Sequence, residues 1–523
     1  MTMTKTSEQG WIDQVLAALG GGGGRSLIEF LQRQRWFGGK GKPLTDVRLL
    51  DAIELSTGAE PRLLAVLLVE YRGGAQERYL VPLSVKLKTA SDEAAAIVEL
   101  PGSSGLQWVC DATREDEIWR ALYGVIGEQR EIVGQSGCVM GRVMAGCRQE
   151  LAGPVHRFKV LSAEQSNTSV VIDQRVIMKL IRKVEMGINP ESEILEFLTT
   201  QTYCGDVPLL LGILTYDAGV ADERDLGTII VVQRFVPNQG DGWAYTLAYL
   251  EEVLGHGRKS VSKHGGDLPK IVREVSGAFM SEVRRLGVIT GNLHLALSSN
   301  MESEAFRPEP ITDQDVDRWC RAMVKYLAEA CRDLRALSLD QRTAIGLSLD
   351  EVAGLEASCR DRSGDLRLLM NERTTKIRHH GDYHLGQVLK TDEGFIVIDF
   401  EGEPARPLEE RRAKMCPLRD VAGMLRSFNY AAQTTLKRQQ PVSDRDVAIM
   451  AEWEAEARKA FLDGYRSSAT PGQASFLPAS WQDTHRVIQV YELDKALYEL
   501  RYEMRNRPDW LSIPLQGIRT ILR

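Results

Sequence analysis

The chain has 523 residues, of which 43% are hydrophobic and 26% are charged, and its formal net charge is −7. Such values are typical of a globular protein of about two to four domains, and the negative charge argues against nucleic acid or an anionic membrane as the main partner. No apolar run reaches the roughly 18 residues of a transmembrane helix, and the polar start Met1–Gln9 lacks the apolar core of a signal peptide. The eight cysteines are scattered without a C-x-x-C pair, so we expect reduced thiols in a cytoplasmic protein and neither disulfides nor a zinc site.

The first hundred residues predict a small β-rich domain. Two apolar segments, Leu63–Tyr71 and Tyr79–Val85, flank Gly73-Gly74, and this pattern is typical of a β-hairpin. Apolar residues then recur at helical spacing over Asp116–Val125. We expect a cap-like domain over residues 1–100 and a second domain over residues 101–237.

The second β-rich region begins near Phe158 and contains a lysine within an apolar strand. Lys179 lies inside the run Val176–Ile181, where burial of an unpaired charge is costly. A helix opened by Asn189-Pro190 follows, and its Glu193 is the expected partner of Lys179. Strand, Lys, helix and Glu is the order in which kinase-like small lobes hold the α- and β-phosphates. A solvated lysine at a strand edge is the alternative interpretation.

The pattern changes after the next strand, which ends at Gln233 and leads into Phe235 and Val236. In a kinase-like fold, the hinge between the lobes would lie here, and its backbone groups would bind adenine. From there to the end of the chain the pattern is mostly helical, so we expect a third domain over residues 238–523. The polar segment Gly255–Pro269 predicts an exposed loop.

One stretch of little more than twenty residues, His379–Glu401, concentrates groups that bind metals or move protons. Asp382 and Gln387 lie on a loop punctuated by glycines, and Asp399 follows a buried apolar run. The turn sequence Asp392-Glu393-Gly394 predicts a hairpin that would bring Gln387 close to Asp399. A carboxylate base, an amide oxygen and a second carboxylate are what phosphoryl transfer with magnesium requires.

Other interpretations of this stretch stay open. Three histidines could bind zinc, but no helix is predicted there and no cysteine is near; they are His379, His380 and His384. Asp382 and Asp399 could form the carboxylate pair of a glycoside hydrolase, which leaves Lys179 without a role. A purely structural loop is the third alternative.

The last long helix shows two different faces. One face is apolar and carries Leu493, Leu497, Leu500 and Met504. The opposite face combines aromatic rings with hydrogen-bonding groups, namely Tyr491, Lys495, Tyr498, Glu499 and Tyr502. Rings that stack on C–H surfaces and charged groups that bind hydroxyls suit a sugar, whereas a solvated face with incidental tyrosines is the alternative.

Seven segments carry a resemblance to a known family: Arg35–Lys40, Glu164–Ser169, Phe235–Trp243, His380–Leu389, Asp399–Pro404, Pro417–Phe428 and Glu492–Glu499. The His-Gly-Asp core, with Gln387 and Asp399 after it, resembles the aminoglycoside phosphotransferase superfamily. The longer segments are similar to bacterial maltokinases, both free-standing and fused to trehalose synthase. Arg234 departs from this pattern, because an acidic residue is expected there.

This resemblance implies a fold and a reaction. The fold would be α+β and bilobal, like that of eukaryotic protein kinases and aminoglycoside phosphotransferases, with an N-terminal β-rich cap. The reaction would be ATP-dependent phosphorylation of maltose at its anomeric hydroxyl, giving maltose 1-phosphate and ADP for α-glucan and glycogen synthesis. ATP and Mg²⁺ would be the cofactors, and trehalose synthase would be a candidate partner.

The resemblance also implies a role for each site residue. Asp382 would be the catalytic base, and Gln387 with Asp399 would hold magnesium. Lys179, paired with Glu193, would contact the phosphates. The remaining nucleotide-binding residues would be Ser166, Asn167, Thr168, Ser169, Gln233, Phe235 and Val236, and the sugar would be bound by Asp382 with His380, Lys495, Tyr498, Glu499 and Tyr502.

Two alternative functions stay open. A kinase for another acceptor, such as glucosamine or an aminoglycoside, is the nearer one, although the Lys495 cation would repel a cationic amino sugar. The other is a pseudokinase that regulates trehalose synthase. The complete set of Lys179, Asp382, Gln387 and Asp399 argues against a pseudokinase.

Overall fold

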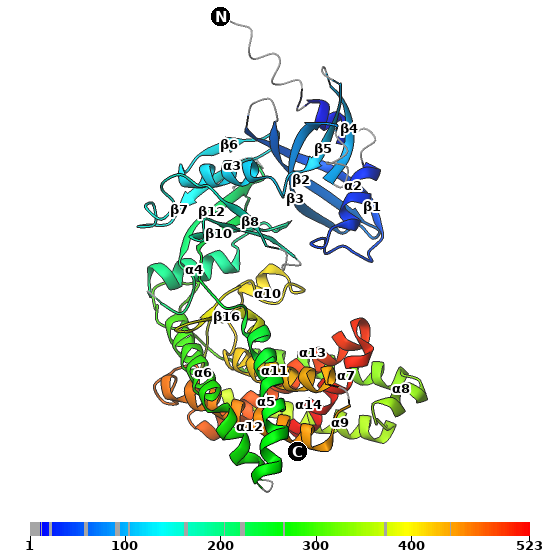
Figure 1. Ribbon diagram of the computed structural model, residues 1–523, viewed down its shortest axis with the longest axis vertical. Helices are drawn as coiled ribbons and strands as arrows, with labels where there is room; N and C mark the ends of the chain where they lie inside the picture. The colour runs from blue at the N-terminus through cyan, green and yellow to red at the C-terminus, as the bar shows by residue number, and fades with distance from the viewer. Residues whose placement is uncertain are drawn as a thin grey trace, which may run out of the picture. The chain divides into compact units, whose positions relative to one another are not determined.

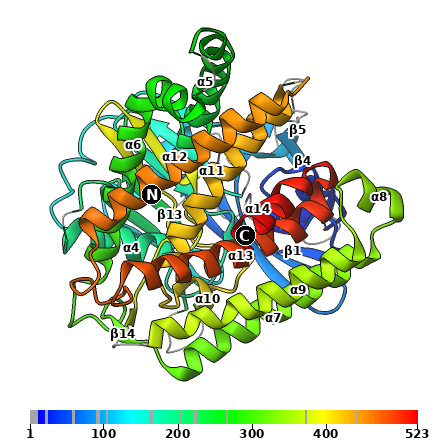
Figure 2. The ribbon, with the colours of Figure 1, turned by 90° about the horizontal axis from the view of Figure 1, so that it is seen from below.

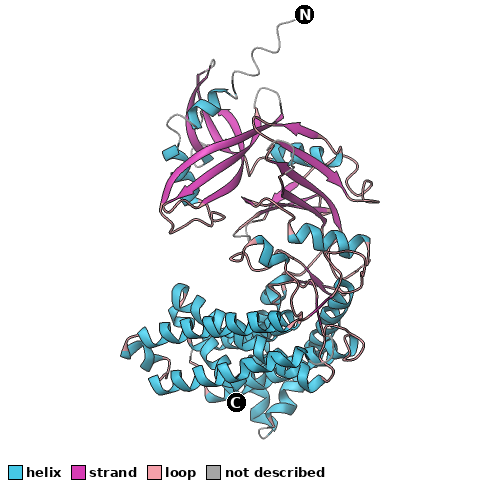
Figure 3. Cartoon of the chain, turned by 180° about the vertical axis from the view of Figure 1, so that it is seen from behind, coloured by secondary structure: helices cyan, strands magenta, loops and turns pink. Residues whose placement is uncertain are grey.

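The computed structural model describes residues 11, 13–19, 24–56, 61–88, 95–102, 105–161, 166–202, 204–219, 225–264, 267–370, 374–439 and 441–522, without the side chains of residues 259–264. Met1–Gln9 and the Glu164-Gln165 part of the shared segments lie outside these ranges. The chain forms two compact units, Met1–Gln201 with Pro208–Pro237, and Thr202–Val207 with Asn238–Arg523. Strands are concentrated in the first unit and helices in the second (Figure 3).

The first unit begins with an antiparallel sheet in the order β1-β2-β3-β5-β4 (Figure 1). Its strands are β1 (Leu44–Ser56), β2 (Arg62–Tyr71), β3 (Gln76–Leu87), β4 (Ala96–Gly102) and β5 (Gly105–Asp111). The predicted hairpin is confirmed as β2 and β3, and its turn contains Gly73 and Gly74 at positive φ. The domain boundary predicted at residue 100 is wrong, because it cuts β4, which pairs with β5 to complete the sheet.

The core of this cap sheet is apolar and covered by α2 (Gly24–Arg33). Phe30 and Leu31 of α2 are buried together with Phe37, Val69 and Val81. Burial of such side chains is the main favourable term in folding. The cap is therefore held by a hydrophobic core of its own.

The second sheet of this unit has the order β6-β7-β12-β13-β10-β9-β8. Its strands are β6 (Glu131–Val133), β7 (Cys138–Val143), β8 (Phe158–Val160), β9 (Thr168–Ile172), β10 (Val176–Leu180), β12 (Leu210–Asp217) and β13 (Leu226–Arg234). The predicted strand around Lys179 is confirmed as β10. The short strand β11 (Lys183–Val184) pairs with Tyr79 and Arg78 of β3, so the chain leaving β10 hydrogen-bonds directly to the cap sheet.

Two further helices of the first unit match predicted helical segments. The first, α3 (Asp116–Gly127), buries Trp119, Leu122 and Ile126. The second, α4 (Pro190–Thr200), starts after Asn189, whose side chain accepts a hydrogen bond from the Ser192 backbone N–H. This N-cap fixes the start of α4, with Pro190 in the first turn, where it needs no backbone donor.

The second unit is mostly helical, and Figure 2 shows its long helices from below. They are α5 (Gly242–His264), α6 (Leu268–Leu297), α7 (Asp313–Ala336), α9 (Leu349–Ser363), α11 (Leu418–Arg438), α12 (Asp444–Ser468), α13 (Trp481–Asn506) and α14 (Ser512–Leu522), with the shorter α8 (Leu339–Ala344) and α10 (Leu408–Arg412). The loop predicted over Gly255–Pro269 is wrong, because α5 continues to His264 and Asp267 caps the start of α6. Within the described ranges, no helix combines the length and hydropathy that spanning a membrane requires.

The hairpin predicted in the His379–Glu401 stretch is confirmed. It consists of β16 (Val388–Thr391) and β17 (Gly394–Val397), with Val388 opposite Val397. Asp399 follows β17 with φ of 67°, a left-handed conformation that Asp tolerates better than most residues. The loop before β16 and the residue after β17 therefore lie at the same end of the hairpin.

Candidate functional site

The loop that carries Asp382 is anchored by a buried carboxylate from α11. Asp420 is 2% exposed and accepts hydrogen bonds from the backbone N–H groups of His380 at 2.8 Å and Gly381 at 3.0 Å. His294 Nε2 of α6 lies 3.1 Å from the same carboxylate. Burial by itself would raise the pKa of Asp420, but the neighbouring His379 and His294 outweigh it and hold this pKa well below its usual value. Asp420 therefore stays ionised and fixes the backbone directly before Asp382.

His380 does not lie in a sugar pocket, and its predicted role is wrong. The side chain is 1% exposed, and its ring packs against Tyr383 and Phe400 with centroid distances of 5.2 and 4.9 Å. Its Nε2 lies 2.9 Å from the Ile398 carbonyl, and its Nδ1 accepts a hydrogen bond from the Asp382 N–H. Both ring nitrogens are thus used inside the loop, which also argues against the zinc interpretation.

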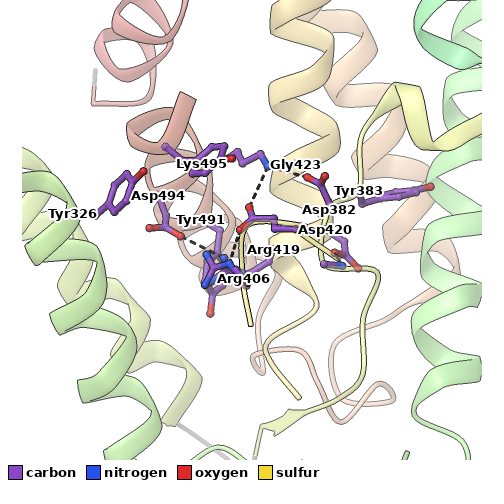
Figure 4. A pocket seen from close by; sticks show the side chains of 13 residues that line it. Tyr326, Asp382, Tyr383, Arg406, Arg419, Asp420, Gly423, Tyr491, Asp494 and Lys495 are labelled. Carbon is purple, nitrogen blue, oxygen red and sulfur yellow. Dashed lines mark hydrogen bonds and ion pairs between the residues drawn. The ribbon is translucent and has the colours of Figure 1, made fainter. Parts of the chain in front are cut away.

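Asp382 lies between a lysine and a histidine. Lys495 Nζ of α13 is 3.1 Å from Asp382 Oδ1 and 3.3 Å from Glu403 Oε1. In Figure 4, the Lys495 side chain points toward Asp382. Burial would lower the pKa of Lys495, but Asp382, Glu403 and Glu499 outweigh it and raise this pKa. Lys495 is therefore a permanent cation beside Asp382.

On the other side, His384 Nε2 is 4.0 Å from Asp382 Oδ2. Its Nδ1 accepts a hydrogen bond from the Gly386 N–H, so the proton of the neutral ring lies on Nε2, toward Asp382. Burial lowers the pKa of His384, which favours this neutral form. Asp382 thus has one cationic and one neutral polar neighbour.

A small hollow opens beside Asp382. Its lining combines acids, bases and tyrosines: Tyr326, Gly381, Asp382, Tyr383, Glu403, Arg406, Arg419, Asp420, Gly423, Tyr491, Asp494, Lys495 and Tyr498. Tyr326 of α7 and Tyr498 of α13 are stacked at 6.4 Å with an interplanar angle of 20°. Such a lining offers aromatic faces and charged hydrogen-bonding groups together, as a polyhydroxylated ligand requires.

Two of the predicted sugar-binding residues on α13 lie outside this hollow. Glu499 accepts two hydrogen bonds from the buried Arg426, at 3.0 Å from Nε and 2.7 Å from Nη2. Tyr502 is 45% exposed near the end of the helix, beneath the Arg507 guanidinium. Both predictions are wrong, because the helix extends past the hollow and only Tyr491, Asp494, Lys495 and Tyr498 face it.

Gln387 and Asp399 lie side by side, as the hairpin predicted. The Gln387 Nε2 donates to Asp399 Oδ2 at 2.9 Å. An amide and a carboxylate are oxygen donors of the kind that a hard divalent cation prefers. The donor chemistry of this pair therefore fits magnesium.

In the first unit, Lys179 is paired with a different glutamate from the predicted one. Its Nζ is 3.0 Å from Glu191 Oε2, and Glu191 is 2% exposed. Gln233 Nε2 donates to the other oxygen, Glu191 Oε1, at 3.1 Å. Glu191 and Glu193 are two positions apart, so their side chains lie about 200° apart around the axis of α4. It is Glu191 that α4 turns toward Lys179 of β10.

The predicted nucleotide loop is shorter than the sequence indicated. Only Ser166 and Asn167 precede β9, because Thr168 and Ser169 are buried strand residues opposite Leu180 and Lys179. The Thr168 hydroxyl accepts a hydrogen bond from Arg182 Nε at 2.9 Å, which directs it into the protein.

The predicted hinge residues differ in what their backbone groups do. The Phe235 N–H donates to the Arg175 carbonyl at 2.8 Å, so it is already used within the lobe. Val236 is half-buried, and its role in binding adenine stays a prediction.

Comparison with known proteins places these observations in a family context. Residues 30–115 match the family of the maltokinase N-terminal cap domain. Glucosamine kinase from Streptacidiphilus jiangxiensis is 25% identical over 372 residues, which cover 69% of this chain and 73% of that protein. Glucosamine kinase from Mycolicibacterium smegmatis is 23% identical over 372 residues, which cover 69% and 79%.

The solved structures give the decisive comparison. A glucosamine kinase in complex with glucosamine, ADP and inorganic phosphate superimposes with a TM-score of 0.61 at 19% identity, over 95% of this chain and 99% of that one. A second crystal form of a glucosamine kinase gives a TM-score of 0.63 at 20% identity, over 94% and 97%. This chain has a protein-kinase-like fold. The fold is α+β, and it carries an N-terminal β-rich cap whose residues match the maltokinase cap family, so the predicted fold class is confirmed.

Several residues that line the hollow were not predicted from the sequence. Glu403 and Arg419 lie inside segments that carry the resemblance, but nothing in their spacing assigned them to the hollow. Asp494 belongs to the polar face of α13 one position before Lys495, and its omission was avoidable. Tyr326 lies on α7, whose sequence predicts only a core stripe, and no local signal could have placed it opposite Tyr498.

Proposed function

We propose that this protein is an ATP-dependent, magnesium-requiring sugar kinase that phosphorylates maltose at its anomeric hydroxyl. The products would be maltose 1-phosphate and ADP, and the first would feed α-glucan synthesis in the cytoplasm. The observation that carries the proposal is the position of Asp382, at the edge of a polar, tyrosine-walled hollow and between Lys495 and His384. The maltokinase-type cap supports maltose as the acceptor.

Each group has a separate task in this proposal. Asp382 accepts the hydrogen bond of the acceptor hydroxyl and orients its oxygen for attack. Lys495 supplies positive charge beside Asp382. Gln387 and Asp399 would hold the magnesium ion, which supplies neutralisation of phosphate charge when bound. In the first unit, Lys179 would contact the phosphates while Glu191 keeps its side chain in position.

A second acceptor, glucosamine, is favoured by a specific observation. The curated relatives are glucosamine kinases, at 25% and 23% identity. Against it, the hollow beside Asp382 continues into a larger chamber that shares Tyr326, Glu403, Arg406 and Asp494 and extends to Trp319. This chamber has about 780 Å³, which is typical of ligand pockets, so a disaccharide can place its second ring there, whereas a single hexose has no second ring.

An acceptor panel tests the proposal. Purified protein with ATP and Mg²⁺ is incubated with maltose, glucose, glucosamine or an aminoglycoside, and ADP release and the phosphorylated product are measured. We expect the largest kcat/KM with maltose, and product analysis should locate the phosphate on the anomeric oxygen. A preference for glucosamine would transfer the proposal to that acceptor, and absence of turnover with every acceptor would support the pseudokinase alternative.

A separate prediction concerns ATP binding by Lys179 and its partner Glu191. Glu191→Gln removes the charge that holds Lys179 and should weaken ATP binding about tenfold or more, because a hydrogen bond between charged groups is worth about 1.5–3 kcal/mol. Isothermal titration calorimetry with ATP and Mg²⁺ measures this without turnover. Glu193→Gln is the matched control and should change the affinity less than about threefold. A larger effect of Glu193→Gln than of Glu191→Gln would contradict the assignment.

A further inference from the structure

A stripe of charged residues runs along α13 from the hollow to the end of the helix. Lys495, Glu499 and Glu503 follow one another at intervals of four residues, so they lie on one side of the helix, and Arg507 is the residue directly after its end. Lys495 faces Asp382 and Glu403 at one end. At the other end, Arg507 is paired with Glu503 at 2.6 Å. Between them, Glu499 is a carboxylate one helical turn from the lysine of the site.

A second cation, the Arg426 guanidinium, holds the Glu499 carboxylate. Arg426 of α11 is 2% exposed, and both its Nε and its Nη2 donate to the same oxygen, Glu499 Oε2. The guanidinium also lies over the Tyr430 ring at 5.7 Å. A buried arginine with two hydrogen bonds to one carboxylate is a strong and directional pair.

The C-terminal helix leaves room for this arginine. Gly517 of α14 packs directly against Arg426, and a Cβ added there would lie 2.7 Å from Arg426 Cζ. That separation is shorter than a van der Waals contact, so any side chain at residue 517 must displace the guanidinium. The packing of α14 therefore fixes where Arg426, and with it Glu499, can lie.

We propose that Arg426 is a positioning residue that keeps Lys495 on Asp382 by occupying Glu499. Without Arg426, Glu499 becomes an uncompensated buried carboxylate one helical turn from Lys495, and the cost of leaving such a charge unpaired is high. Lys495 is the nearest cation on the same side of α13, so it moves to Glu499 and leaves Asp382. Arg426 itself contacts neither the hollow nor Asp382, and the inference rests on the role proposed above for Asp382 and Lys495.

The test is a mutant cycle with a structural and a kinetic measurement. Crystal structures of Arg426→Met and of the double variant Arg426→Met/Glu499→Gln show where Lys495 lies, independently of any substrate. In the single variant we expect Lys495 Nζ to form an ion pair with Glu499. Its distance from Asp382 should then exceed about 4 Å, the limit of an ion pair. In the double variant Lys495 should return to Asp382, because a neutral glutamine no longer competes for it.

The kinetic measurement uses maltose as acceptor, or whichever acceptor the panel selects. Arg426→Met should lower kcat at least tenfold, and Glu499→Gln added to it should restore kcat to within about threefold of the wild type. A merely structural role predicts the opposite, since the double variant would be no more active than the single one. Failure of the proposed function shows as an inactive wild type, whereas failure of this inference shows as Lys495 unmoved in the Arg426→Met crystal.

Two further variants serve as controls, one for the loss of another arginine and one for poor folding of Arg426→Met. Arg458→Met removes a half-buried arginine of α12, which pairs with the buried Glu492 of α13 at 2.6 Å, and it should lower stability without lowering kcat more than about threefold. Gly517→Ala keeps both charges and displaces the Arg426 guanidinium, so it should lower kcat in the same direction as Arg426→Met even if that variant folds poorly. Equal losses of kcat in Arg458→Met and Arg426→Met, or normal kcat in Gly517→Ala with a displaced guanidinium, would overturn the proposal.

Discussion

Asp382→Asn is expected to lower kcat by about 10²–10⁴-fold while the affinity for ATP stays unchanged. The asparagine keeps the size of the side chain, and its Oδ1 can still accept the hydrogen bond that Lys495 donates at 3.1 Å. It lacks the negative charge that accepts the proton of the acceptor hydroxyl, so orientation and proton acceptance are lost together. Steady-state kinetics with maltose give kcat, and calorimetric titration with ATP gives the affinity.

A matched substitution separates this effect from general damage. Asp392 lies on the β16–β17 turn, where its Oδ1 accepts a hydrogen bond from Gln239 at 2.7 Å. Asp392→Asn changes one exposed charge of the same hairpin and should leave kcat within about threefold. If Asp382→Asn retained wild-type turnover, Asp382 could not be the base, and the proposed mechanism would have to be abandoned.

Asp420→Asn is expected to have the largest effect on stability. The carboxylate is 2% exposed, and it accepts bonds from His380 N, Gly381 N and His294 Nε2. An asparagine has an NH₂ group in place of one carboxylate oxygen, so at least one of these N–H groups would face another donor instead of an acceptor. Removal of one partner from a buried charged pair costs about 3–5 kcal/mol. Urea unfolding followed by fluorescence measures the change in the free energy of unfolding.

The pH dependence of this difference checks the cause. Because the folded protein holds the pKa of Asp420 below its usual value, the stabilisation by Asp420 is present above the unfolded pKa of about 3.9 and is lost as the pH falls through the folded pKa. The gap between wild type and Asp420→Asn should therefore be constant between pH 7 and pH 5 and shrink below about pH 4.

An exposed ion pair provides the comparison for Asp420. Asp463 is 42% exposed and pairs with Arg284, so Asp463→Asn should cost about 0–1 kcal/mol. A cost for Asp420→Asn as small as that of Asp463→Asn would contradict the anchoring role.

The local elements around the site could be predicted because their signals are local. The hairpin β16–β17 follows from two apolar runs and the turn between them, and this topology alone brings Gln387 to Asp399. The strand around Lys179 follows in the same way from its apolar neighbours, and it pairs with the preceding strand β9. In both cases the residues that interact are separated by few positions, so the pattern of one segment contains the information.

Predictions that depended on which side of a helix faces a neighbour were less accurate. The sequence places both Glu191 and Glu193 in the first turns of α4, but only packing against the sheet turns Glu191 toward Lys179. On α13 the polar face was recognised, yet the hollow ends before Glu499 and Tyr502. The reason is that helical periodicity defines a face of the helix but not which length of that face a neighbouring element covers.

The sequence by itself determined that this chain has a kinase-like α+β architecture with a cap, and that Gln387 lies beside Asp399. Only the tertiary structure decided that Asp420 anchors the loop from α11 and that Tyr326 of α7 lies opposite Tyr498. It also decided that Lys495 bridges Asp382 and Glu403. These contacts join residues from separate helices and loops, and their partners are selected by burial and charge compensation after the chain has folded, which no local pattern of the sequence records.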